Sequence, residues 1–466
     1  MRGRLVLGVS CSIFTALGVV AGCVGDDPVT SPTTPDGAAP TDGSTPTDSS
    51  SGDVATTDGG DAVAPQCDVT PCVVQISAGG AHTCARIADG TVRCWGRNLL
   101  GQCGGGTVTA ATSGAPQDTV TPDLYAKPHE VAGLTGATVV GTGGSYRADG
   151  VSCVGTGAGK MQCWGIDRSQ QLGRGGVERV GDLAPAPARP EPAPVVTISN
   201  VSDISVGARH VCAVFTAGAV ACWGGDIFGT LGFPPAGKTF GIPQPLATPT
   251  KFTRVVARGQ HNLALAADRK VWSWGNNRDG QHGVTAGSPA DAPVEAIAAL
   301  TGTYVDVAAG RKHGCAIDTT GKVWCWGGGS EGQLGRGPSS LVTTDPVPGV
   351  VSFAPGSIVK QIAGDEWHMV ALLDDGTVWR WGTMITGQTP IPADDAGAPD
   401  PMDTPLSTPQ QVTLPGKAKQ VVAGYEHACA LLTTGAVHCW GNNRHGELGR
   451  GTSGDGIKPT PAPVVF

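Results

Sequence analysis

The dipeptide Trp-Gly occurs seven times in the chain, and this repetition limits the possible folds more than any other feature. Successive copies are 69, 59, 51, 52, 55 and 59 residues apart. The tryptophans concerned are Trp95, Trp164, Trp223, Trp274, Trp326, Trp381 and Trp440. A recurring unit of this size is typical of repeat proteins, in which each copy buries its apolar faces against its neighbours.

The fifth copy shows the shared pattern clearly. It runs Val-Asp-Val-Ala-Ala-Gly-Arg-Lys-His-Gly-Cys-Ala-Ile over residues 305–317, has a Thr-Gly turn at 320–321, and continues as Val-Trp-Cys-Trp-Gly at 323–327. The apolar runs predict short strands and the Gly turn predicts a hairpin. A later Pro-x-x-Val element, such as residues 409–412, supplies a further strand. Four short strands per copy predict an all-β fold, a seven-bladed β-propeller.

The two ends of the repeat region predict how the ring closes. Residues 461–466 are of the Pro-x-x-Val type and no further copy follows them, whereas the first copy, from Val73, has no such strand before it. We therefore expect residues 463–466 to complete the blade that begins at Val73. Strands from the N- and C-terminal ends would then lie in one blade and leave no open sheet edge.

The patterns Gly-x-x-His-x-(Cys/Leu)-Ala-Leu, Gly-x-Val-x-x-Trp-Gly and Gly-Gln-Leu-Gly-x-Gly together resemble the regulator-of-chromosome-condensation repeat. The resemblance covers roughly residues 73–466. Copies 3, 5 and 7 match best, copy 2 lacks the His, and copy 6 ends at Gly387-Gln388 without the Leu-Gly. That family forms seven-bladed propellers and includes both an exchange factor for a small GTPase and a secreted inhibitor of β-lactamases. The resemblance therefore implies a propeller that binds another protein.

Cysteines occupy one pair of positions in five of the seven copies, ten residues apart and on either side of the hairpin turn. The remaining two copies lose both members together, which is what a disulfide predicts. Facing residues of a hairpin lie within disulfide range. The predicted pairs are Cys84–Cys94, Cys153–Cys163, Cys212–Cys222, Cys315–Cys325 and Cys429–Cys439.

Three further cysteines belong to the repeat region. We expect Cys67 and Cys72 to pair and to hold the N-terminal strand. Cys103 replaces the Leu of Gly-Gln-Leu-Gly, and it is either a buried free thiol or a competitor for Cys67 or Cys72. Cys-x9-Cys beside a His is not a usual zinc spacing, so we expect no metal site.

The first 22 residues have the features of a lipoprotein signal peptide. Two Arg residues precede an apolar stretch of 17 residues, Leu5 to Ala21, which is short for a membrane span. The stretch ends in Val-Ala-Gly-Cys, which resembles the bacterial lipobox. We expect cleavage before Cys23, a lipid on Cys23 and an anchor in the cell envelope, at the outer membrane because Val24 rather than Asp follows. The alternative is an ordinary cleavable signal with a Cys there by chance.

Residues 23–66 are predicted to be a disordered tether, and residues 67–466 the propeller. Beyond Cys23 the tether has eight Asp and no aromatic, Lys or Arg residue, so it cannot bury enough surface to fold. Without these Asp and the two Arg of the signal, 39 acidic and 31 basic residues become 31 and 29, a net charge of −2. A nucleic-acid-binding domain needs a basic surface, so we expect no nucleic-acid partner. We expect the propeller to be monomeric.

The repeated His and Trp residues are predicted to be structural. Equivalent His side chains in separate blades do not form the single asymmetric group that catalysis needs, and we expect each to link strands within its blade. They are His82, His210, His261, His313, His368 and His427. The Trp of each Trp-Gly should fill the space between sheets, and its Gly should allow close backbone approach. Trp272, Trp324 and Trp379 lie two residues earlier and extend the core or add an aromatic edge.

No sequence pattern indicates a catalytic, cofactor-binding or metal-binding residue. The Gly-rich segments lack the strand-to-helix context of a phosphate loop. Asp394, Asp395, Asp400 and Asp403 match no calcium motif. Four segments are longer than the repeat needs, and long loops on a rigid scaffold are where binding usually occurs. They are residues 104–130, 176–200, 226–250 and 383–410.

We therefore predict a non-enzymatic, envelope-anchored binding module that presents propeller loops to a protein partner. One alternative is a carbohydrate-binding or adhesion propeller, which needs exposed Trp or Tyr side chains; the chain has four Tyr residues. Another is a propeller enzyme with its site in the central channel. That function needs carboxylates at equivalent positions of several blades, and none is evident in the sequence.

Overall fold

The structure, a computed structural model, describes most of the repeat region. The described residues are 67–109, 119–144, 150–157, 159–176, 179–180, 187–233, 237–284, 290–295, 300–384, 405–454 and 456–466. The predicted signal peptide, the lipid on Cys23, the tether and the four Asp residues from Asp394 to Asp403 lie outside them. No helix among these residues is long and apolar enough to cross a membrane.

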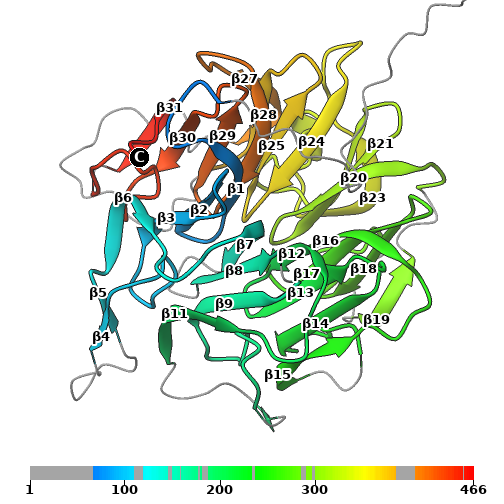
Figure 1. The fold of residues 1–466 in the computed structure, drawn as a ribbon. Coiled ribbons are helices and arrows are strands. Elements are labelled where there is room, and N and C mark those ends of the chain that lie inside the picture. Colours follow the sequence, from blue (N-terminus) through cyan, green and yellow to red (C-terminus); the bar gives the residue numbers. More distant parts are fainter. Residues whose placement is uncertain are drawn as a thin grey trace, which may run out of the picture. The chain divides into compact units, whose positions relative to one another are not determined.

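Seven antiparallel sheets surround a central axis and form the predicted propeller (Figure 1). The first strand of each blade lies beside the first strands of the neighbouring blades, at the axis. These inner strands are β1 (Val73–Ala78), β7 (Ala137–Gly144), β12 (Val201–Val206), β16 (Phe252–Arg258), β20 (Tyr304–Ala309), β24 (Val359–Gly364) and β28 (Ala418–Ala423).

Each copy of the repeat supplies the next two strands of the same sheet. The second strands are β2 (His82–Ile87), β8 (Gly150–Thr156), β13 (His210–Phe215), β17 (His261–Ala266), β21 (His313–Asp318), β25 (His368–Leu373) and β29 (His427–Leu432). The third strands are β3 (Val92–Arg97), β9 (Met161–Ile166), β14 (Val220–Gly225), β18 (Val271–Gly275), β22 (Val323–Gly328), β26 (Val378–Gly382) and β30 (Val437–Asn442).

The fourth strands form the outer edges of the blades. They are β6 (Leu124–Glu130), β11 (Ala188–Pro194), β15 (Lys238–Pro245), β19 (Ala290–Glu295), β23 (Thr344–Val350), β27 (Leu406–Val412) and β31 (Ile457–Pro463). Every one contains Pro, which removes a backbone donor from the exposed edge. The remaining elements are a hairpin of β4 (Thr107–Thr109) with β5 (Thr119–Thr121), the short strand β10 (Arg179–Val180), which pairs with β15, and the 3-10 helix η1 (Pro338–Ser340).

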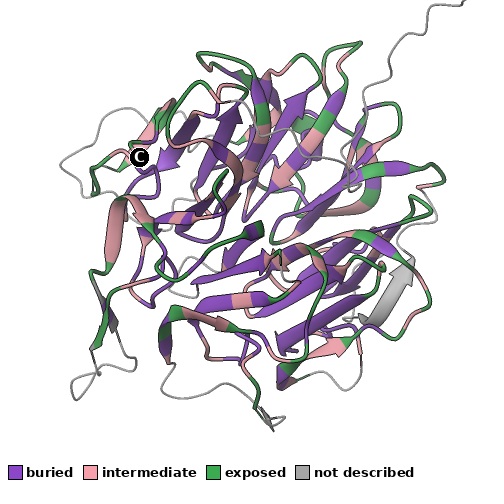
Figure 2. Ribbon diagram, viewed as in Figure 1, coloured by how far each residue is buried: buried purple, intermediate pink, exposed green. Residues whose placement is uncertain are grey.

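Most residues of the blade strands are buried (Figure 2), and the apolar clusters they form join residues of neighbouring blades. Each of the seven Trp-Gly tryptophans is fully buried. Trp164 of blade 2, for example, packs against Val92 of blade 1. Complete burial of a large apolar side chain contributes about 2–3 kcal/mol, so the seven interfaces together account for much of the fold's stability.

The prediction that both chain ends share one blade was wrong. β31 pairs with β30 in blade 7, and β1 pairs with β2 in blade 1. The Pro-x-x-Val strand follows the third strand of its own copy, so each copy forms one complete blade. Blades 7 and 1 close the ring by packing against each other. The Tyr425 backbone N–H donates to the carbonyl of Gly80 at 3.0 Å, and the Phe466 ring meets Trp95 edge-on, with centroids 5.9 Å apart.

The five predicted cysteine pairs face each other across the second and third strands and form disulfides, with Cα atoms 4.1 Å apart. Cys67 and Cys72 form a sixth disulfide, beside the Gly435 turn of blade 7. Cys103 is a buried free thiol whose Sγ donates to the carbonyl of Arg97 at 3.2 Å. The competing pairing of Cys103 with Cys67 or Cys72 is therefore absent from the structure.

Candidate functional site

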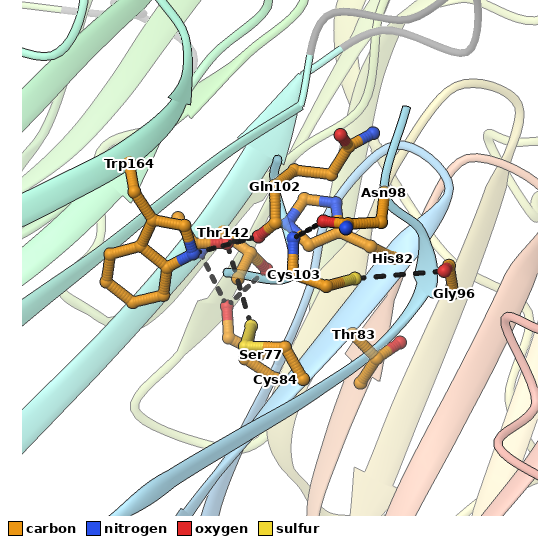
Figure 3. Close-up of a disulfide and its surroundings, with 12 residues drawn as sticks. Ser77, His82, Thr83, Cys84, Gly96, Asn98, Gln102, Cys103, Thr142 and Trp164 are labelled. Atoms are coloured by element: carbon orange, nitrogen blue, oxygen red, sulfur yellow. Dashed lines mark hydrogen bonds between the residues drawn. A yellow bond between two sulfur atoms is a disulfide. The ribbon is translucent and has the colours of Figure 1, made fainter. Parts of the chain in front are cut away.

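The repeated His side chains connect neighbouring blades. His82 Nε2 lies 2.9 Å from Ser152 Oγ of blade 2. Figure 3 shows His82 in the surroundings of the disulfide that includes Cys84. His210 Nε2 donates to Asn262 Oδ1 of blade 4 at 2.8 Å. The prediction that each His links strands within its own blade was therefore wrong. Side chains stand perpendicular to a sheet, so they reach the stacked sheet more easily than a strand beside them.

Four of the six repeated His side chains contact a side chain of the next blade, whereas Gly314 and Ala428 stand at the corresponding positions for His261 and His368. The partner is the residue directly after the His position in the next copy. In blade 2, Val151 replaces the His, and Val211 stands at the partner position of blade 3. At the interface where blade 7 meets blade 1, His427 Nε2 of blade 7 lies 2.7 Å from Thr83 Oγ1 of blade 1.

Burial keeps these His side chains uncharged near neutral pH. It lowers the pKa of His82 and His313 to about 3 and the pKa of His210 and His427 to about 4. A group that titrates near pH 3–4 is poorly matched to proton transfer at neutral pH. The described geometry thus agrees with a structural role for the repeated His.

The Gly-Gln-Leu-Gly segments are turns that accept the Trp of the next blade. Trp164 Nε1 donates to the carbonyl of Gln102 at 3.1 Å (Figure 3). The Gln102 side chain accepts the backbone N–H of Leu100 and so stabilises its own turn. Five further Trp–carbonyl bonds follow the same rule: Trp95–Glu447, Trp223–Gln171, Trp274–Thr230, Trp326–Gln281 and Trp381–Gln333. The turn that would serve Trp440 lies outside the described residues.

The Gly of each Trp-Gly has a positive φ, as the prediction of close backbone approach requires. Gly224 has φ 103°, and a Cβ there would lie 2.5 Å from the carbonyl oxygen of Arg209. The three additional tryptophans, Trp272, Trp324 and Trp379, are partly buried and pack against the apolar clusters of their blades. They extend the core, which is the first of the two roles predicted for them.

A belt of side chains surrounds the channel, and the sequence analysis missed it. It is formed by the third residue of the inner strand in five blades: Gln75, Asp203, Asp306, Gln361 and Gln420. Each accepts a backbone N–H from the inner strand of the next blade, at 2.9–3.3 Å. The belt therefore fixes the relative height of neighbouring blades at five of the seven interfaces.

Two belt residues correct the sequence analysis, which found no carboxylates at equivalent positions of several blades. Asp203 and Asp306 occupy one position in blades 3 and 5, and Arg254 lies between them and pairs with Asp306. The pKa of both carboxyls is raised, because the effect of burial is larger than the opposing effect of the Arg254 charge. No three His, Cys, Asp or Glu side chains within the described ranges are grouped to hold a metal ion. The carboxylates serve the contacts between blades.

The residues that differ most in charge and aromatic character between copies of the repeat lie on one face of the propeller. The turn between first and second strands has two variable residues before the His, and in blades 5, 6 and 7 these are Arg311-Lys312, Glu366-Trp367 and Tyr425-Glu426. The half-buried Trp367 lies under two cations, Arg311 at 5.6 Å and Lys312 at 5.3 Å from its ring. Arg311 also pairs with Glu366. We call these three pairs the variable-pair surface.

The long segments predicted from the sequence emerge at the same end of the blades. Each of the four contains the connection from a third strand to a fourth strand, and antiparallel topology places this connection beside the first turn of the blade. Lys312 Nζ lies 3.5 Å from Asp279 Oδ1, which belongs to the shorter third-to-fourth-strand connection of blade 4. Large parts of the long segments lie outside the described residues, but their flanking strands are placed.

Glu447 is an unusual member of the repeat, because it stands where five other copies have Gln. Its side chain is buried and Oε2 accepts the backbone N–H of His445 at 2.8 Å. Burial, with a smaller contribution from Glu426, raises the pKa of Glu447 to about 8, although Arg97 opposes this. The folded protein therefore holds a proton on Glu447 that the unfolded chain releases at lower pH.

Replacing Glu447 with Gln should stabilise the propeller selectively at alkaline pH. A folded pKa above the unfolded value of about 4.5 means that stability falls as pH rises from about 5 to 8. Gln mimics the protonated acid, so Glu447→Gln should unfold at nearly the wild-type temperature at pH 5. At pH 8.5 it should be about 2 kcal/mol more stable. Thermal unfolding at both pH values checks this; an equal difference at both would contradict it.

Seven sheets joined by repeated His and Trp contacts define the class of protein as a seven-bladed repeat propeller with a variable face. A family model described as "RCC1-like domain" matches residues 219–465, and another, "Regulator of chromosome condensation (RCC1) repeat", matches residues 73–102. The first covers more than half of the chain, so the chain belongs to the RCC1-like domain family.

Individual proteins also resemble the chain, in sequence or in structure. The ultraviolet-B receptor UVR8 of Arabidopsis thaliana is 27% identical over 389 residues, which is 82% of this chain and 80% of the receptor. Human E3 ubiquitin-protein ligase HERC2 is 28% identical over 365 residues, 67% of this chain but 7% of the ligase. The structure of yeast RCC1 (Prp20) bound to Kap60 superposes with a TM-score of 0.63 at 18% identity, and covers 85% of this chain and 86% of that one. That likeness shows the shared fold.

Proposed function

We propose that the protein is a non-enzymatic binding module whose variable-pair surface, together with the long loops beside it, binds a protein partner. The observation that carries this proposal is the grouping of aromatic and charged side chains at the variable positions of an otherwise constant repeat. Trp, Tyr and Arg are the residues most enriched where binding energy concentrates in protein interfaces. Related propellers support the class of partner, since yeast RCC1 has been solved with Kap60 bound.

The chemistry of the surface favours a polar protein partner. Trp367 is half-buried and held by the two cations above it, so its position is fixed before a partner arrives. A preorganised aromatic side chain loses little entropy on binding. On the same face, Arg278 lies 4.8 Å above the Phe228 ring, which continues the pattern of cations over aromatic rings.

Export and anchoring belong to the same proposal. The N-terminal sequence supports a lipid on Cys23 and a tether through residue 66, which would display the propeller in the cell envelope. The surface of the propeller is then accessible to envelope or secreted proteins rather than to cytosolic ones.

A pull-down with oxidised residues 67–466 tests the binding surface. Wild type, Trp367→Ala and Lys312→Ala serve as baits against cell-envelope and secreted proteins of the source organism, with bound proteins identified by mass spectrometry. Lys417→Glu is the matched control, because Lys417 is exposed at the opposite end of the blades. All four baits should show equal thermal stability before use.

The expected result is one or a few partners retained by wild type and Lys417→Glu, and reduced at least about tenfold by Trp367→Ala, as for an interface hot spot. Equal enrichment by all four baits would contradict the proposed surface. If no protein is enriched but a glycan array shows binding, the carbohydrate-binding alternative replaces the protein-binding one.

A further inference from the structure

Two charged residues stand where the repeat has glycine. Three residues before the repeated His, blades 1, 3, 5 and 7 have Gly, whereas blade 4 has Arg258 and blade 6 has Asp365. Strand pairing confirms the equivalence for Arg258, which pairs with His261 at the end of β16. Both side chains are largely buried, with 17% and 9% of their surfaces exposed. Two such departures at one position suggest a shared role.

The Arg258 guanidinium reaches the inner strands of four other blades. Its Nη2 donates to the carbonyl of Ala78 at 3.4 Å, and its Nη1 donates to those of Thr142 at 3.4 Å and Val206 at 3.1 Å. Its Nε donates to the carbonyl of Gly364 at 3.3 Å. These carbonyls belong to blades 1, 2, 3 and 6, on different sides of the ring. One small group can meet all four only at the axis.

Asp365 completes the surroundings of the guanidinium. Its Oδ2 lies 3.7 Å from Arg258 Nε, and its Oδ1 accepts the backbone N–H of Glu366 at 2.8 Å. A planar guanidinium carries five donors and no acceptor, which suits a ring of carbonyl oxygens with one carboxylate. Without the cation, the buried carboxylate would lose its charge partner, which is costly.

We propose that the ends of the inner strands form an axial site for a guanidinium-type cation, which the protein fills with its own Arg258. The occupied site closes the channel beneath the variable-pair surface. A channel cavity of about 130 Å³, lined by Arg258, Gln75, Arg254 and Gln420 among others, lies on the side away from that surface. This inference does not depend on the proposed binding function.

Chemical rescue tests the site. Arg258→Gly restores the residue that four other blades carry, so the backbone should accept it, and it should lower the melting temperature by several degrees. Guanidinium chloride at about 10 mM, far below denaturing concentrations, should then raise the melting temperature of Arg258→Gly by about 2 °C or more. Wild type and the exposed-site control Arg189→Ala should show no rise, and sodium chloride at equal concentration should rescue none of them. A response of Arg258→Gly no greater than that of wild type would overturn the proposal.

A measurement on the wild-type protein remains decisive if Arg258→Gly does not fold. The Nε–H resonance of Arg258 is identified as the one missing from the ¹⁵N spectrum of Arg258→Lys. A group enclosed by carbonyls should exchange with solvent at least about tenfold more slowly than the exposed Arg189. Exchange as fast as that of Arg189 would show an open channel and overturn the inference.

Discussion

Replacing Gly207 with Ala is expected to lower the free energy of unfolding by about 2–4 kcal/mol, because the added methyl has no room. A Cβ at this position would lie 2.3 Å from Cε1 of His210 and 2.7 Å from its Nδ1. The ring cannot simply move aside, since His210 Nε2 is bonded to Asn262 of the next blade. The methyl must therefore either distort the turn or break a contact between blades.

Urea unfolding of wild type, Gly207→Ala and Gly416→Ala measures this effect. Gly416 is the matched control, because a Cβ added there would have Leu432 Cδ1 as its nearest neighbour, at 3.9 Å. Gly416→Ala should lie within about 0.5 kcal/mol of wild type. Removing the imidazole in Gly207→Ala/His210→Ala should cost less than the sum of the two single changes, since the methyl then has space. Additive losses would show that the crowding is not with His210.

Replacing Gln420 with Ala should destabilise the ring at its closing interface by about 2–3 kcal/mol. Gln420 of blade 7 makes two hydrogen bonds to one residue of blade 1: Oε1 accepts the N–H of Ile76 at 2.9 Å, and Nε2 donates to its carbonyl at 3.0 Å. Ala leaves both backbone groups without this partner. The closing interface should then open more often than the rest of the ring.

Gln361→Ala is the internal standard for this experiment. Gln361 holds the equivalent belt position and accepts one hydrogen bond, from Val421 N at 2.9 Å, so its loss should cost about 1 kcal/mol. Chemical denaturation gives the two values, and hydrogen exchange at the Ile76 amide reports local opening. If Gln420→Ala costs no more than Gln361→Ala and Ile76 exchange is unchanged, the second hydrogen bond does not strengthen closure.

The repeated features of the fold were predictable from the sequence because they recur in register. Trp-Gly at seven positions predicted seven blades, and the joint presence and absence of two cysteines predicted which residues face each other across the hairpin. Ring closure was not predictable in the same way. The first copy lacks a preceding Pro-x-x-Val strand under either arrangement, so only the pairing of β31 with β30 distinguishes them.

Neither the variable-pair surface nor the axial site could be read from the repeat itself, because both are made by departures from it. Arg258 and Asp365 are far apart in the sequence, and nothing local to either signals the other. Only the ring geometry brings the ends of β16 and β24 to one axis. Likewise, the sequence does not distinguish Trp367 from the other ten tryptophans as a surface residue. Its position became evident only from the structure, which shows it in the turn between β24 and β25.

The bond from each Trp indole to the preceding turn has an evolutionary consequence. A copy that makes this bond presents the Trp indole N–H as donor to the preceding blade, and its own turn presents a carbonyl as acceptor to the following blade. Duplication or deletion of one whole copy would join a donor to an acceptor at the new junction, whichever copy was involved. Such contacts therefore do not fix the number of blades, unlike the hydrogen bonds of Arg258, which need blades 1, 2, 3 and 6 in their places around the axis.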